Sequence, residues 1–269
     1  IWSCEAPAGL GSPSGVAAAG GVVFSVTSGA NVYASNATTG EHIWSLTGGT
    51  YAAPPVVVED RLYLGGGFDT GAVYCVNATT GASIWSYSPT QDGVRWIAVT
   101  YGKVYVSCGS WETSTEGAIY CLDMYDGSFI WSFDTNRDYA GDLAIANGKV
   151  YFSASYEGWN CIVYALNATN GAIVWSTTPY PNSDAGSTAV AYGKVFIQLG
   201  YSGRGVYALD ETNGNEIWAF PIIPEQPVEL HQCRPLWVIV ADSKVFFGPS
   251  YPDHRFYAVN ASTGSIIWS

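Results

Sequence analysis

The chain is made mostly of short runs in which apolar residues alternate with polar or small ones. A representative stretch, "LAIANGKVYFSASYEGWNCIVYALNATNGAIVWS", begins at Leu143. A period of two predicts β-strands, and no run of helical period is long enough to compete. We expect strands at 142–146, 149–154, 161–167 and 172–176. The residues of "NGK" and "NATNG" tolerate positive φ and suit tight turns, so the four strands should form one antiparallel sheet.

The same pattern recurs along the whole chain. Its closing segment reads "NATTGEHIWS" (36–45), "NATTGASIWS" (77–86), "DMYDGSFIWS" (123–132), "NATNGAIVWS" (167–176), "DETNGNEIWA" (210–219) and "NASTGSIIWS" (260–269), and the chain opens on a stub, "IWS". Successive tryptophans lie between 41 residues apart (Trp44 to Trp85) and 50 residues apart (Trp218 to Trp268). A sheet of this size cannot bury both faces alone, whereas sheets stacked around an axis can.

These units predict an all-β fold, a β-propeller of four-stranded antiparallel blades. The sequence contains six complete units, so we expect six blades in a single domain over 1–269, or seven or eight if the chain continues. One tryptophan per unit should pack between adjacent blades near the rim. These residues are Trp44, Trp85, Trp131, Trp175, Trp218 and Trp268.

Composition and charge restrict the partners. With 22 acidic and 10 basic side chains the net charge is −12, which argues against nucleic acid and anionic membrane, since both are bound through clustered Lys and Arg. No apolar run is long enough to span a bilayer. The chain starts inside a repeat without Met or a signal sequence, so we expect a processed or partial product.

Six cysteines, four Asn-x-Ser/Thr sequons and few lysines favour an extracellular or cell-surface location. The disulfide candidates are Cys108 with Cys161, and Cys4 with Cys233. Alternatively, free cysteines fill small core positions, as Cys75 would where other repeats have Ala.

The sequons occupy one slot of the repeat, in the turn before the last strand. Asn36, Asn77, Asn167 and Asn260 are the candidate glycosylation sites. Asp123 and Asp210 fill the same slot in the other two units, so the slot requires a short acceptor that closes an Asx-type turn whether or not a glycan is attached.

The pattern "GKVYFS…VYALNATNGAIVWS" resembles the repeat of the pyrroloquinoline-quinone-like (PQQ-like) propeller family. "GKV" recurs at Gly102, Gly148 and Gly193, and "VYAL" at Val163 and Val206. The resemblance implies either a quinone-dependent dehydrogenase or a cofactor-free assembly scaffold or surface protein, and the Asn-Ala-Thr turns are similar to those in surface proteins of methanogenic archaea. Fold alone does not decide between these functions.

An antiparallel meander places the A–B and C–D turns on one side and the B–C and D–A loops on the other. The four lysines fall in A–B turns, while most arginines and many aromatic residues fall on the loop side or begin strand A. This composition is typical of a recognition surface for a protein or glycan, although long loops also pack their own aromatics. The candidate binding residues are Arg95, Trp96, Trp111, Arg137, Tyr156, Trp159, Tyr201, Arg204, Arg234, Trp237, His254 and Arg255.

The resemblance implies that an enzyme of this family would carry adjacent cysteines over its quinone, a calcium site and a catalytic Asp. The chain has no Cys-Cys pair and only three His. Acidic turns such as "DMYDG" lack the oxygen ligands of a dedicated calcium loop. We therefore expect no cofactor, no metal and no catalysis, with a quinoprotein dehydrogenase as the alternative. The expected function is that of an extracellular binding or assembly module, with self-assembly as a further option.

Overall fold

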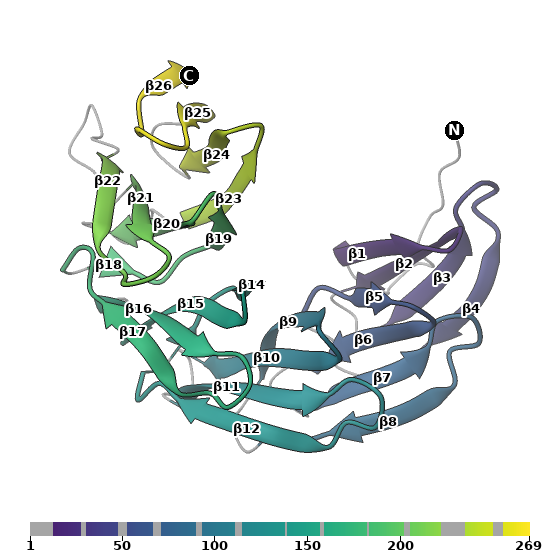
Figure 1. Cartoon of the computed structure of the whole chain (residues 1–269). Coiled ribbons are helices and arrows are strands. Elements are labelled where there is room, and N and C mark those ends of the chain that lie inside the picture. The colour runs from purple at the N-terminus through teal and green to yellow at the C-terminus, as the bar shows by residue number, and fades with distance from the viewer. Residues whose placement is uncertain are drawn as a thin grey trace. The chain divides into compact units, whose positions relative to one another are not determined.

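The computed structural model describes residues 13–27, 31–47, 53–66, 71–89, 93–110, 115–137, 139–156, 159–181, 183–201, 205–221, 235–249 and 255–269. The chain divides into two compact units, Ile1–Ser132 and Phe133–Ser269. Each unit contains three antiparallel sheets, and every regular element of the described residues is a strand (Figure 1). The fold is a β-propeller with six blades in the chain, as predicted. We number the blades 1 to 6 along the chain and name their strands A to D.

The first unit holds blades 1 to 3, and in each one the strands pair in chain order. Blade 1 is β1 (Pro13–Ala19), β2 (Val22–Thr27), β3 (Val32–Asn36) and β4 (His42–Leu46); blade 2 is β5 (Val56–Val58), β6 (Arg61–Gly65), β7 (Val73–Asn77) and β8 (Ser83–Tyr87); blade 3 is β9 (Val94–Thr100), β10 (Lys103–Ser110), β11 (Thr115–Asp123) and β12 (Phe129–Asp134).

The second unit holds blades 4 to 6. Blade 4 is β13 (Tyr139–Ala140) with β14 (Ala144–Ala146), then β15 (Lys149–Tyr156), β16 (Trp159–Asn167) and β17 (Ile173–Thr177); blade 5 is β18 (Ser183–Asp184) with β19 (Thr188–Ala191), then β20 (Lys194–Tyr201), β21 (Gly205–Asp210) and β22 (Glu216–Pro221); blade 6 is β23 (Pro235–Ala241), β24 (Lys244–Pro249), β25 (Tyr257–Asn260) and β26 (Ile266–Trp268).

Strand A of blades 4 and 5 differs from the continuous strand that the sequence predicts. In blade 4 it is broken between β13 and β14, and both pieces pair with β15. At the break the amide of Gly141 donates to the carbonyl of Ser153 over 2.8 Å, so the chain stays attached to strand B while it leaves the ladder. Strands B and C, in contrast, extend beyond their predicted ends, to Tyr156 and from Trp159.

An aromatic pair occupies the same place in every blade. The strand-D tryptophan lies against an aromatic residue of strand B, with ring centroids 5.8–6.2 Å apart. The pairs are Phe24 with Trp44, Tyr63 with Trp85, Tyr105 with Trp131, Tyr151 with Trp175, Phe196 with Trp218 and Phe246 with Trp268. In blades 1 to 5 these pairs are buried or partly buried within the blade, whereas Trp268 of blade 6 is half-exposed.

The same tryptophans connect neighbouring blades within each unit, which confirms their predicted structural role. The indole Nε1 donates to a carbonyl in the next blade's C–D turn: Trp44 to Ala78 (3.0 Å), Trp85 to Met124 (3.2 Å), Trp175 to Glu211 (3.0 Å) and Trp218 to Ala261 (3.1 Å). The glycine of that turn lies over the indole ring, so close that a Cβ on Gly214 would fall 2.6 Å from Trp175 Cε3. Trp268 differs from the prediction, since 49% of it is exposed.

The turns behave as the sequence predicts. The A–B hairpins have two-residue turns with positive φ, such as Asn147 (49°) and Gly148 (71°), and a lysine or arginine begins strand B in blades 2 to 6. In the C–D turns the Asn or Asp side chain accepts backbone amides. Asn77 Oδ1 accepts from the amides of Thr79 and Thr80 over 3.0 and 2.9 Å. The slot is therefore an Asx turn in all six blades, aspartates included.

The predicted disulfide between Cys108 and Cys161 is wrong. Both are free and fully buried, and each belongs to the apolar core cluster of its own unit. Each thiol lies on a central strand of its blade, where it fills the space of a small apolar side chain. Cys75 and Cys121 are likewise free and buried, as the alternative interpretation predicts. Cys4 and Cys233 lie outside the described residues.

Candidate recognition site

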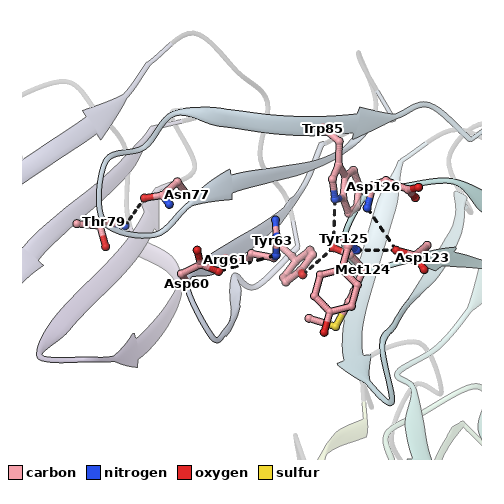
Figure 2. Close-up of polar contacts among 10 residues, drawn as sticks. All are labelled: Asp60, Arg61, Tyr63, Asn77, Thr79, Trp85, Asp123, Met124, Tyr125 and Asp126. Carbon is pink, nitrogen blue, oxygen red and sulfur yellow. Dashed lines mark hydrogen bonds and ion pairs between the residues drawn. The ribbon is translucent and has the colours of Figure 1, made fainter.

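Comparing equivalent positions of the six repeats shows where the sequence departs from its own pattern. The clearest departures in the first unit lie between blades 2 and 3. Strand B of blade 2 begins with Arg61, where blades 3 to 6 have Lys. The C–D turn of blade 3 carries Met124 and Tyr125, where the other blades have Thr or Ser at the position of Tyr125. We call Arg61, Tyr63, Met124 and Tyr125 the Arg61 cluster (Figure 2).

A cation and an aromatic ring meet at the centre of this cluster. The guanidinium carbon of Arg61 lies 5.3 Å from the ring centroid of Tyr125, within the range of a cation–π interaction. The nearest acid, Asp60, is 3.9 Å from Arg61 Nε, which is too long for a hydrogen bond. The Asp60 side chain is also 65% exposed, so solvent weakens this ion pair. The guanidinium therefore has a cation–π contact with Tyr125 in addition to a weak, solvent-screened ion pair with Asp60.

Hydrogen bonds from blade 2 and from Asp123 hold the turn that carries Tyr125. The carbonyl of Met124 accepts from Tyr63 Oη at 3.0 Å and from Trp85 Nε1 at 3.2 Å, both in blade 2. The side chain of Asp123 accepts the Tyr125 amide at 2.7 Å. Met124 is buried, whereas Tyr125 is 52% exposed. A rigid turn thus presents a half-exposed aromatic ring backed by a positive charge (Figure 2).

Two ionisable side chains beside Arg61, Cys75 and Tyr63, are shifted by burial. Burial raises the pKa of the Cys75 thiol, more than the neighbouring Arg61 guanidinium lowers it. Burial likewise raises the pKa of the Tyr63 phenol far above its ordinary range. Both groups therefore keep their protons at neutral pH, so Cys75 is not a thiolate nucleophile and Tyr63 is not a general base there.

Chemically, the cluster is suited to recognition. Tyrosine and arginine supply many binding hot spots, because the ring buries a large area and loses little conformational freedom. Sequence reasoning overlooked this site, since it placed the recognition residues on the loop side. The signal that could have found it is the departure of Tyr125 from the Thr or Ser of the other five repeats.

The predicted loop-side residues are only partly brought together. Arg95 is not in a D–A loop but is the second residue of β9, where its Nε donates to the carbonyl of Gly109 over 3.0 Å. Arg137 does lie between β12 and β13, half-buried. Tyr156 and Trp159 are register partners, Tyr156 as the last residue of β15 and Trp159 as the first residue of β16. They therefore belong to the strands, not to the loop between them.

The other predicted loop-side residues lie on different strands or beside them. Trp96 is half-buried on β9, Tyr201 ends β20, and Trp237 on β23 is 66% exposed. Arg255 is exposed just before β25. Trp111, Arg204, Arg234 and His254 lie outside the described residues.

The described residues contain neither a metal-binding cluster nor a membrane-spanning helix. No group of three or more His, Cys, Asp or Glu side chains there could hold a metal ion. In that part of the chain there is also no helix long and apolar enough to cross a membrane.

Comparison with known proteins identifies relatives of the whole chain. The family described as "Outer membrane protein assembly factor BamB" matches residues 1–71 and 69–269. No curated protein matches the chain in sequence.

Solved structures share the fold. BamB from Moraxella catarrhalis is 19% identical with a TM-score of 0.71, covering 94% of this chain and 71% of that one. The computationally designed protein Ika8 is 15% identical with a TM-score of 0.75, covering 96% and 74% of the two chains. A quinohemoprotein alcohol dehydrogenase from Pseudomonas putida is 13% identical with a TM-score of 0.68, covering 94% and 65%. At these identities the likeness concerns the fold alone.

Proposed function

Because the chain belongs to the family of outer membrane protein assembly factor BamB, we propose that it is a non-catalytic propeller that binds partner proteins in the cell envelope, outside the cytoplasm. The family description names an assembly factor, which supports a binding or assembly role. The acidic chain, with a net charge of −12, also argues against nucleic acid as the partner.

The single observation that carries this proposal is the exposed ring of Tyr125 held over Arg61. A half-exposed tyrosine adds little to the core, and a Thr or Ser serves the same turn in five blades. One face of the ring contacts Arg61 of blade 2, and the exposed remainder of the ring is available to a partner. An aromatic anchor on a rigid turn fits a protein surface better than a reacting small molecule.

Site-specific photo-cross-linking in the native cell tests this function. A photoreactive phenylalanine at position 125 is expected to give one discrete adduct with an envelope protein. The matched control places the same residue at Thr212, the equivalent exposed position of blade 5. Equal labelling from both positions, or none from 125, would contradict recognition at this site.

A purified partner allows a sharper measurement. Tyr125→Thr restores the residue of the other turns and should weaken the affinity about tenfold or more, as expected for a binding hot spot. The free energy of unfolding should change by less than about 0.5 kcal/mol, because the residue is at the surface. A loss of affinity that merely follows a loss of stability would indicate a structural role.

The loop side remains a second proposed surface. Replacing Trp111, Trp159 and Arg255 with Ala should abolish binding to a protein or glycan partner there, with thermal unfolding nearly unchanged. If these side chains only order their own loops, the triple variant will instead unfold at a lower temperature.

We also propose that the sequons carry glycans if the chain is exported by a glycosylating cell, such as the archaeal cells whose surface proteins its turns resemble. The Asx turn uses Oδ1 of each sequon asparagine as an acceptor, so the turn does not depend on a free Nδ2. Intact-mass measurement of the native protein should show added hexose-type masses. The unmodified mass would refute this proposal.

A quinoprotein dehydrogenase is the alternative function. The fold is shared with a quinohemoprotein alcohol dehydrogenase. However, the chain lacks adjacent cysteines, and its described cysteines are buried singly on separate strands. These residues do not fit a quinone site of that kind, which favours the binding role over the catalytic one.

A further inference from the structure

The interface between blades 4 and 5 contains a buried acid. Within each unit, the residue after the Asx position accepts the indole donor of the preceding blade, and these residues are Ala78, Met124, Glu211 and Ala261. Ala37 and Ala168 occupy the same position of their repeats. Glu211 is the ionisable member, and it is only 8% exposed. A carboxylate buried at such a position is costly unless it is compensated.

Blade 4 supplies this compensation from its A–B hairpin. Oε1 of Glu211 accepts from Asn147 Nδ2 at 2.8 Å and from Tyr151 Oη at 3.1 Å. Lys149 Nζ lies 3.6 Å from the same oxygen and provides the opposite charge. The three donors are alternate residues of one hairpin. Its turn is fixed by the amide of Ala168, which donates to the carbonyl of Gly148 over 2.9 Å.

This set of donors occurs once among the six repeats. The equivalent triplets are Gly20, Val22 and Phe24; Glu59, Arg61 and Tyr63; Tyr101, Lys103 and Tyr105; Asn147, Lys149 and Tyr151; Tyr192, Lys194 and Phe196; and Asp242, Lys244 and Phe246. Blade 4 alone combines an amide, a cation and a phenol. The one acidic acceptor and the one complete donor set thus meet at the same interface.

The energetic consequence is discrimination between neighbours. A buried ion pair adds little net stability over well-packed apolar residues, but a buried charge without its partner is strongly destabilising. If blade 5 packed against blade 1 in place of blade 4, Glu211 would face Val22 and Phe24. Against blade 2 it would face Glu59, a like charge, beside Arg61 and Tyr63. Against blade 3 it would keep a cation and a phenol but lose the amide donor of Asn147, because Tyr101 stands in that position. Repeats this similar in sequence otherwise present nearly the same packing surface to one another.

We propose that Glu211 and the Asn147–Lys149–Tyr151 donors specify blades 4 and 5 as neighbours and exclude other pairings of the repeats, within one chain or between two copies. The tryptophan–glycine contacts recur between neighbouring blades within each unit and do not distinguish one pair from another. Glu211 and its donors determine which two blades become neighbours.

Placing a glutamate one blade further along tests whether a buried acid at this position requires the matching donors of the preceding blade. Ala261 lies beside Trp218 as Glu211 lies beside Trp175, but blade 5 offers Tyr192, Lys194 and Phe196. Ala261→Glu alone should raise the unfolding equilibrium constant about tenfold or more. The double variant Tyr192→Asn, Phe196→Tyr supplies the missing amide and phenol. Adding Ala261→Glu to this double variant should raise its unfolding equilibrium constant less than about threefold. An equal cost in both backgrounds would overturn the proposal.

Refolding of the full chain tests the consequence for assembly. Glu211→Ala introduces the alanine found in other repeats, and the control, Trp218→Phe, weakens the next interface by removing the indole donor to Ala261. After dilution from denaturant at high protein concentration, Glu211→Ala should give at least twice the fraction of swapped oligomers on size exclusion that Trp218→Phe gives. Oligomer formation that follows equilibrium stability alone in both variants would show that Glu211 merely stabilises the blade.

Discussion

Two glycines of the second unit separate the contribution of backbone strain from that of the contact between blades. Gly148 and Gly214 have nearly the same φ, 71° and 75°. A Cβ on Gly148 would meet nothing within 4 Å, whereas on Gly214 it would lie 2.6 Å from Cε3 of Trp175 in the neighbouring blade. Alanine at either position therefore has a similar backbone cost, but only Gly214→Ala also displaces the tryptophan.

The magnitudes follow from these geometries. A left-handed conformation costs an L-residue about 1–2 kcal/mol, which is the expected loss for Gly148→Ala. Overpacking adds about 1–3 kcal/mol, so Gly214→Ala should lose about 2–5 kcal/mol. Urea denaturation of the two variants measures the difference.

Relief of the clash supplies the control. In a Trp175→Leu background the ring atoms that Gly214 contacts are gone, so Gly214→Ala should cost no more than Gly148→Ala does. The coupling free energy of this double-mutant cycle is then about 1–3 kcal/mol. Equal losses for the two alanine variants in the wild-type background would refute the inter-blade contact as described.

Three further predictions concern the turns, the thiols and alkaline pH. Asn77→Asp should leave the free energy of unfolding unchanged, because Asp123 closes the equivalent turn, whereas Asn77→Ala should lose about 1 kcal/mol in the same urea assay; equal losses would argue against the Asx turn. Burial raises the pKa of both Cys108 and Cys121 to about 12, so a thiol reagent at pH 8 should label them in the native protein only at the rate of unfolding, and fast labelling would contradict their burial. Burial also raises the pKa of Tyr207 to about 12, whereas the phenol of the unfolded chain loses its proton near pH 10. The melting temperature should therefore fall as pH rises from about 10 to 12, and a constant melting temperature across that window would count against the burial of this phenol.

Much of the fold could be predicted because it depends on local patterns that repeat. Period-two alternation indicated the strands, and the Asx slot indicated the C–D turns. The position of Trp175 within its repeat indicated packing between blades, and the indole bond to Glu211 confirms it. The break of strand A at Gly141 has no such local signal, since it depends on a hydrogen bond to Ser153 across the sheet.

The candidate site was harder to predict because it depends on which residues of different blades meet. Arg61 and Tyr125 lie in different repeats, far apart in the sequence. Each departs from the repeat pattern at its own position, but the sequence alone does not show that the two side chains meet. The disulfide prediction failed for a related reason. Cys108 and Cys161 were judged by their place near loops, whereas each side chain belongs to the core of its own unit.

We propose that this propeller binds partners and performs no quinone chemistry of its own. The most direct test is to mix the full chain with pyrroloquinoline quinone and calcium, separate it by gel filtration, and record the absorbance of the protein peak together with dye-linked alcohol oxidation. The account predicts that no quinone chromophore co-elutes with the protein and that no alcohol is oxidised. A stoichiometric chromophore in the protein peak with alcohol-dependent dye reduction would contradict it.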